Sequence, residues 1–283
     1  MNTATSEFKI STGRRIALLP GTLKAGIAIV ALWILVAIFA PWLAPADPNA
    51  IDLHNVLQPP GAQWILGTDH AGRDLLSRVI YASRIDLWIG FAGVVAPLII
   101  GVIIGLFAGY FGGRTDAALM RVVDITLAFP FLILVLAIVA ILGPGVGNFI
   151  IALALVAWVS YARLIRAEVM VIKEAEYIQA ARTLGYKPLY IIFRHVLPNA
   201  ISPVAVYAMT DAVLVILAGA SLGFIGLGVQ PPTAEWGVMI SDGQAYVIEA
   251  WWICVFPGLA AISLGVGLSL IGDGLARMLR VSN

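Results

Sequence analysis

The stretch that decides the fold is IDLWIGFAGVVAPLIIGVIIGLFAGYF, residues 85–111. It carries one charged residue, Asp86, close to its start. A helix needs about 20 consecutive apolar residues to cross a bilayer, because each residue rises about 1.5 Å through roughly 30 Å of hydrocarbon. A membrane β-strand would be about ten residues long and would alternate in polarity, which this stretch does not. We therefore predict a membrane-spanning helix here.

The rest of the chain has the same character. Of its 283 residues 61% are hydrophobic and 12% are charged, whereas about 25% are charged in an ordinary soluble domain. Further long apolar runs occupy residues 23–44, 117–142, 148–165, 198–224 and 248–275. Inside a bilayer the backbone must satisfy its own hydrogen bonds, which a helix does within one segment. The sequence predicts an all-α polytopic membrane protein with six transmembrane helices.

The distribution of basic residues predicts the orientation, since cytoplasmic loops carry the excess of lysine and arginine. With the N-terminus inside, only Arg73, Arg78 and Arg84 of the 17 basic residues lie outside. We expect cytoplasmic tails at residues 1–22 and 280–283, flanking a transmembrane domain at 23–279. External segments are expected at about 45–84 and 226–247, and the one long cytoplasmic loop at about 166–197.

Several classes of function are disfavoured by the sequence. A net charge of +1 argues against nucleic-acid binding, and a single cysteine, Cys254, excludes an intrachain disulfide. No Gly-Lys pair occurs, so the phosphate-binding loop of ATPases is absent. The segment around Ser221 matches Gly-x-Ser-x-Gly, but none of the three histidines follows it, as the hydrolases with this motif require. Small residues there favour helix packing, as do Gly101, Gly105 and Gly109.

The cytoplasmic loop has its own helical pattern. Tyr177, Ile178, Ala181 and Leu184 recur at helical spacing with polar residues between them, which predicts a short amphipathic helix. A glycine follows at position 185, where the left-handed conformation ends many helices, and a proline three residues later suits the first turn of another helix. The loop is predicted to be a helix, a turn and a second helix.

This loop resembles the cytoplasmic signature of ABC importer permeases. QAARTLG at 179–185 and HVLPN at 195–199 reproduce its two alanines, its glycine and its later Leu-Pro, although Gln179 stands where the signature usually has glutamate. LGTD at 66–69 and GRD at 72–74 are similar to a pattern in the second membrane subunit of dipeptide, oligopeptide and nickel permeases. The resemblance covers nearly all of residues 23–279.

The resemblance implies a type I importer permease in a bacterial inner membrane, with no catalytic role and no cofactor of its own. Its expected partners are a second homologous permease subunit, two cytoplasmic ATPases that bind ATP and Mg²⁺, and an extracytoplasmic substrate-binding protein. Peptides are the expected substrate; nickel complexes and other small solutes remain open. A secondary transporter is the rival class, but such folds commonly contain repeated halves, and no repeat is evident.

Two groups of residues are candidates for function. Those expected to couple the ATPase to transport are Glu176, Gln179, Ala180, Ala181, Arg182, Gly185 and Pro198. Within the spans, Arg121 and Asp124 are spaced to pair on one helix face. Asp211 is a second intramembrane acid, which we expect to face either the pathway or an arginine, since charges at such depth are costly.

Overall fold

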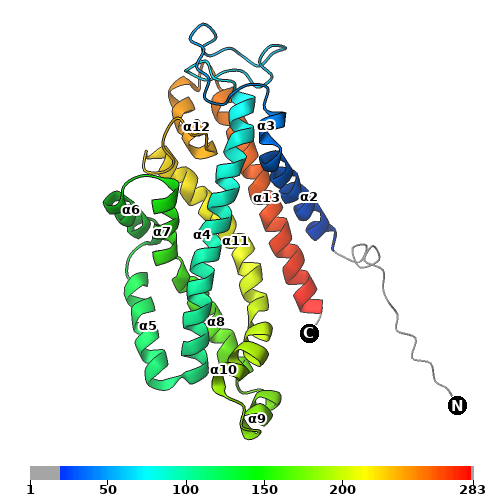
Figure 1. Cartoon of the computed structure of the whole chain (residues 1–283), viewed down its shortest axis with the longest axis vertical. Helices are drawn as coiled ribbons and strands as arrows, with labels where there is room; N and C mark the ends of the chain where they lie inside the picture. Colours follow the sequence, from blue (N-terminus) through cyan, green and yellow to red (C-terminus); the bar gives the residue numbers. More distant parts are fainter. Residues whose placement is uncertain (1–19, 282–283) are drawn as a thin grey trace, which may run out of the picture.

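The computed structural model describes residues 20–281, and it is an elongated bundle of helices (Figure 1). Residues 1–19 and 282–283, which include most of the predicted tails, lie outside the described part of the chain. The helices are α2 (Gly21–Ile38), α3 (Ala40–Leu43), α4 (Leu75–Phe111), α5 (Gly113–Leu127), α6 (Phe131–Leu142), α7 (Val146–Val156), α8 (Trp158–Ile172), α9 (Glu176–Thr183), α10 (Pro188–Ile191), α11 (Leu197–Phe224), α12 (Trp236–Gly243) and α13 (Trp252–Val281).

Five of the six predicted spans are present as helices long and apolar enough to cross a membrane. They cover 21–38, 75–111, 146–172, 188–224 and 252–279. Helix α4 contains 37 residues and is therefore about 55 Å long, well beyond the roughly 30 Å of a hydrocarbon core. Residues 75–84, predicted as part of an external segment, are consequently the first turns of this helix.

The third predicted span is not the continuous helix expected at 117–142. Helices α5 and α6 are separated by a short break and meet at 84°. The physical reason is Pro130, which disfavours the helical conformation at Phe129 and brings no amide hydrogen to the helix. Its own φ and ψ of −58° and 130° lie outside the helical region, and α6 begins at the next residue.

Helices α4 and α8 pack along the predicted glycine face. A Cβ atom on Gly101 would overlap the Trp158 carbonyl, and one on Gly105 would overlap the Cγ2 atom of Ile165 and the Ala162 carbonyl. Only residues without a side chain permit backbones to approach this closely. The prediction of a small-residue packing face is confirmed.

The end of the bundle that is predicted to face outward is closed by residues 44–74 and by α12, which together we call the outer cap (Figure 1). Asp69 accepts a hydrogen bond from the Arg73 Nε at 2.6 Å and lies 3.5 Å from the Arg78 Nε, and all three side chains are buried. The fully buried Trp236 donates its indole N–H to the Val79 carbonyl at 3.1 Å. Buried charges and polar groups are costly unless partnered, so these contacts hold the outer cap in one arrangement.

Candidate functional site

The predicted helix–turn–helix is present at the end of the bundle opposite the outer cap, where α9 projects beyond the long helices (Figure 1). The Gly185 N–H donates to the Arg182 carbonyl at 2.9 Å, and the Tyr186 N–H to the Ala181 carbonyl at 3.2 Å. This pair of bonds is the Schellman motif, which requires a left-handed residue. Gly185 has a φ of +81°, and no atom lies within 4 Å of a Cβ added there. The glycine is therefore explained by its left-handed backbone conformation and not by a lack of room for a side chain.

One face of α9 is anchored in the bundle. Ile178 and Ala181 are buried and belong to the same core as Ile192 and Val196. The Arg182 guanidinium lies 5.1 Å from the centre of the Tyr110 ring, near the end of α4. Ala181 and Arg182 therefore make contacts within the chain itself, and Ala181 presents no surface for a partner.

The opposite face of α9 and the turn after it are exposed. Glu176, Gln179, Ala180 and Gly185 all lie on this side. Tyr177 and Leu184, which belong to the apolar set of the predicted amphipathic helix, are 48% and 76% exposed. Further apolar side chains are exposed in the turn after α9, on α10 and in the π-helical turn that follows it: Tyr186, Leu189, Tyr190 and Phe193. Contiguous exposed apolar side chains beyond a membrane span are typical of a protein–protein contact.

The loop connects without interruption to the helix of the fifth predicted span. A π-helical turn, Ile192–Val196, joins α10 to α11, so residues 188–224 form one helical rod. Pro198 lies in the first turn of α11, directly after this π-helical turn, where the regular α-helical hydrogen bonding is already interrupted. Asn199 donates to the His195 carbonyl at 2.7 Å and to the Tyr177 hydroxyl at 3.4 Å, which links α9 to this rod.

The side-chain amide N–H of Gln179, which a glutamate would lack, forms two hydrogen bonds. Its side-chain N–H donates to the Lys173 carbonyl at 3.2 Å and to the Glu174 carboxylate at 3.4 Å. An ionised glutamate has only acceptors and could form neither bond. The departure from the usual signature is thus accommodated by local hydrogen bonds at the end of α8.

Asp211 lies on α11 and is 8% exposed. Its carboxyl accepts a hydrogen bond from the Tyr161 hydroxyl at 2.7 Å, and its partner is therefore a tyrosine and not an arginine. It lines a cavity of about 450 Å³ together with Ser160, Tyr207 and Ser221. Within residues 20–281 no cation pairs with this carboxyl. An acid inside a membrane span and beside a cavity with hydroxyl groups is typical of a site that a polar solute passes.

The other intramembrane candidates are arranged differently from the prediction. Asp124 pairs with Arg163 of α8 at 2.7 Å and not with Arg121, which is exposed. A second ion pair between the same helices joins Asp116 to Arg166. Sequence reasoning misses both pairs because the partners are about forty or more positions apart, and only the antiparallel packing of α5 and α8 brings them together.

The serine of the Gly-x-Ser-x-Gly pattern has a structural explanation. The Ser221 hydroxyl donates to the Leu217 carbonyl one turn earlier at 2.8 Å. No histidine hydrogen bond to Ser221 occurs within residues 20–281, so the geometry provides no base to activate it.

Comparison with known proteins now places the chain in a family. Residues 101–281 match the model of the binding-protein-dependent transport system inner membrane component, and residues 24–60 match the N-terminal transmembrane domain of oligopeptide transport permease C. The chain belongs to the family of binding-protein-dependent transport system inner membrane components, and it is an ABC importer permease subunit.

Particular relatives narrow the class. The chain is 44% identical over 260 residues to the probable D,D-dipeptide transport system permease protein DdpC of Escherichia coli K12, covering 92% of this chain and 87% of that protein. It is also 44% identical to the di/tripeptide transport system permease protein DppC of Pseudomonas aeruginosa UCBPP-PA14, covering 88% and 84%. In fold it matches the MetNI methionine ABC transporter in an inward-facing conformation, with a TM-score of 0.57, 21% identity, and coverage of 74% and 98%.

The predictions of an all-α type I permease fold and of a multi-pass membrane protein are confirmed.

Proposed function

We propose that this chain forms half of a pathway for di- or oligopeptides across a bacterial inner membrane, driven by two cytoplasmic ATPases, one of which docks on α9 and its turn. The observation that carries the proposal is the exposed apolar surface of Leu184 and its neighbours, at the end of a helix whose other face is fixed to the bundle. A second permease subunit completes the pathway, and an external binding protein delivers the substrate.

Coupling follows from the continuity of the rod at residues 188–224. A displacement of α9 by the ATPases reaches α11 through Ile178, which packs in the same core as Ile192 at the base of the rod. Asp211 lies 13 residues beyond Pro198, about 20 Å along the helix. If the rod moves as a rigid body, it displaces Asp211 and the wall of the cavity that Asp211 lines. Rigid-body movement of this kind suits a switch between inward-facing and outward-facing states. Exposed Glu176, Gln179, Ala180 and Gly185 contribute the polar and close-approach contacts to the ATPase.

Peptides are the proposed substrate because the relatives at 44% identity are described as transporters of D,D-dipeptides and of di- and tripeptides. Every peptide carries polar amide groups, and most carry a charged terminus. The hydroxyl groups of Ser160 and Tyr207, together with the Asp211 carboxyl, provide the hydrogen-bonding groups that such a solute needs inside the membrane.

The ATPase contact is tested with Leu184→Glu in the co-expressed transporter. Leu184 is 76% exposed, so the substitution should leave the fold of this chain intact while placing a charge in the apolar contact. Loss of a central apolar contact costs about 2 kcal/mol or more, which corresponds to retention of the ATPases falling by at least tenfold. The measurement is the amount of ATPase that co-purifies, followed by ATP-dependent peptide uptake in proteoliposomes.

Ile248→Glu is the matched control, since Ile248 is 94% exposed and lies next to the outer cap. It should retain the ATPases. Equal retention and uptake by the Leu184→Glu complex would remove α9 as the docking surface. Uptake of nickel complexes but not of peptides by the wild-type complex would contradict the proposed substrate and leave the docking result standing.

A further inference from the structure

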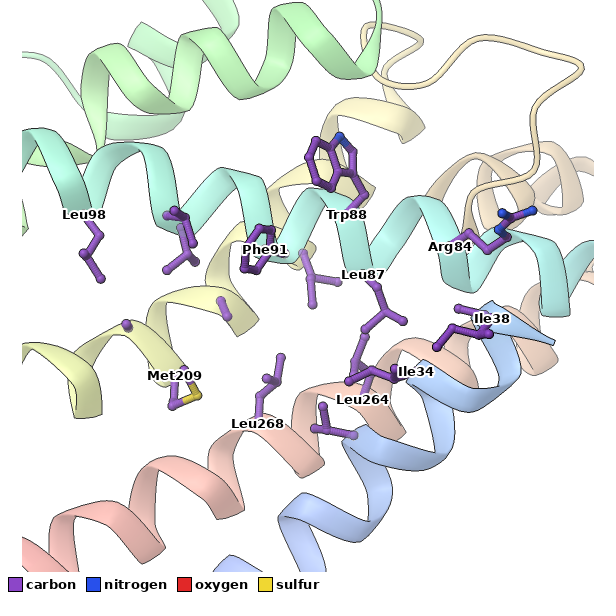
Figure 2. Close-up of a pocket in the computed structure, with 18 residues that line it drawn as sticks. Ile34, Ile38, Arg84, Leu87, Trp88, Phe91, Leu98, Met209, Leu264 and Leu268 are labelled. Carbon is purple, nitrogen blue, oxygen red and sulfur yellow. The ribbon is translucent and has the colours of Figure 1, made fainter. Parts of the chain in front are cut away.

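A second cavity lies in the membrane-embedded half of the bundle nearer the outer cap, away from Asp211. Its volume is about 640 Å³, within the range that encloses a drug-sized ligand. Its walls come from α2, α4, α11 and α13 and are almost entirely aliphatic or aromatic (Figure 2). Because it contains so few polar groups, a peptide would find no partners for its amides there, and the proposed transport route does not use it.

One end of this cavity carries a charge. Arg84 lies at the outer end near Ile38, while Leu98 and Met209 lie at the other end (Figure 2). Arg84 is exposed, and no ion pair to it occurs in the described part of the chain. Asp86, two positions along, is buried and accepts a hydrogen bond from the Trp236 amide instead. The guanidinium is thus available to an anion from outside the chain.

The position of Arg84 matches the membrane boundary. It immediately precedes the long apolar run of α4, and Trp88 follows one turn later on the same face with 54% of its surface exposed. Tryptophan is enriched where hydrocarbon meets the headgroups, and arginine binds phosphate through two parallel hydrogen bonds. From Arg84 to Leu98 is 14 residues, about 21 Å along the helix, whereas one leaflet of hydrocarbon is about 15 Å thick. The cavity therefore runs the depth of a leaflet.

The lining of the cavity favours a lipid as its occupant. An acyl chain needs only apolar contacts, which the walls supply along their length, and a phosphate needs a cation at the level of the headgroups, which Arg84 supplies. A helix of the partner permease subunit would also find apolar contacts there, but it would bring no phosphate to Arg84.

We propose that this cavity binds one anionic phospholipid of the outer leaflet, with an acyl chain between α2, α4, α11 and α13 and the phosphate on Arg84. The lipid fills a gap between the α2–α13 pair and the α4–α11 pair. The site does not depend on peptide being the substrate or on α9 being the docking helix.

The proposal is tested on the purified transporter complex exchanged into an equimolar mixture of phosphatidylglycerol and phosphatidylcholine. Native mass spectrometry then gives the ratio of the two lipids that remain bound. We expect retention of phosphatidylglycerol over phosphatidylcholine, and a loss of that preference by about fivefold in Arg84→Gln, which is the effect of one arginine beside an anionic headgroup. Arg114→Gln, an exposed arginine at the start of α5, is the matched control and should keep the preference.

The acyl chain is tested separately with Ala212→Leu, which adds carbon atoms on the cavity wall. Quenching of Trp88 fluorescence by phosphatidylglycerol brominated on its acyl chain, obtained as the difference from Trp88→Phe, should fall in this variant. Equal lipid ratios in Arg84→Gln and Arg114→Gln would mean ordinary boundary lipid only and would overturn the proposal. So would a disulfide between Leu98→Cys and a cysteine on the partner subunit, because a protein helix would then fill the cavity.

Discussion

Asp211 is the residue whose presence in a membrane span most needs an explanation. It is buried, it accepts a hydrogen bond from the neutral Tyr161 hydroxyl, and it borders a cavity. A residue kept only for stability would be better replaced there by an apolar or neutral one, because intramembrane acids are costly. Function and stability should therefore respond to its replacement in opposite directions.

We predict that Asp211→Asn leaves the unfolding temperature of the complex unchanged or higher, while peptide uptake falls by about tenfold or more. The amide oxygen can still accept from Tyr161, so only the ionisable group is lost. Uptake in proteoliposomes and thermal unfolding in detergent are the two measurements. Asp124→Asn, which alters an exposed surface ion pair, should affect uptake little. Normal uptake by Asp211→Asn would assign Asp211 a structural role.

Single residues were predictable where local geometry determines their role. Gly185 was identified from its place after a helical pattern, and the structure gives it a φ of +81°. The partner of Asp124 was not predictable in this way. Its spacing from Arg121 allows an ion pair, but Asp124 pairs instead with Arg163, which is 39 positions away in the sequence. The helical spacing of Tyr177 and Leu184 shows that they are part of an apolar stripe. It does not indicate which residues of the stripe pack against the bundle and which stay exposed for a partner.

At the scale of elements, α4 and α8 approach each other closely at the glycines of α4. Gly105→Ala should destabilise the protein by about 1–3 kcal/mol, because the new methyl group overlaps a backbone carbonyl that cannot rotate away. Gly258→Ala in α13 is the matched control, since nothing lies within 4 Å of its added Cβ and alanine favours a helix by up to about 1 kcal/mol. Thermal unfolding of both variants in the same detergent measures the difference. A Gly105→Ala protein as stable as the control would show that the helices separate at no cost.

The apolar runs predicted five long helices correctly because hydrophobic length is what a membrane requires. The break between α5 and α6 escaped a pattern based on length, although Pro130 was visible in it. A proline in a membrane helix is often tolerated, since neighbouring groups can satisfy the freed carbonyl. Hydropathy alone therefore cannot distinguish a bent span from a straight one. The outer cap was recognised as a segment, but its buried Asp69 contacts depend on its three-dimensional path.

On the scale of the whole molecule, the first residues of α2 and the last described residues of α13 lie toward the same end of the bundle, and α9 lies toward that end as well (Figure 1). The all-α permease fold was predictable from the sequence. Whether both termini are cytoplasmic stays a prediction, because the arrangement of the helices does not say which end faces the cytoplasm.

The broken span decides by parity whether the described ends of α2 and α13 lie on the same side of the membrane. Five straight crossings are an odd number and would place the two ends of the chain on opposite sides, so a common side requires α5 and α6 together to count as one crossing. In a Cys254→Ser background, which has no other cysteine, Pro144→Cys between α6 and α7 should react with an impermeant maleimide added outside intact cells. Thr183→Cys on α9 should react only after the cells are opened. Exclusion of the reagent from position 144 in intact cells would contradict six crossings with both ends inside, because either the crossings would number five or the whole chain would be inverted. A bend of 84° within one hairpin thus determines whether the two ends lie on one side of the membrane.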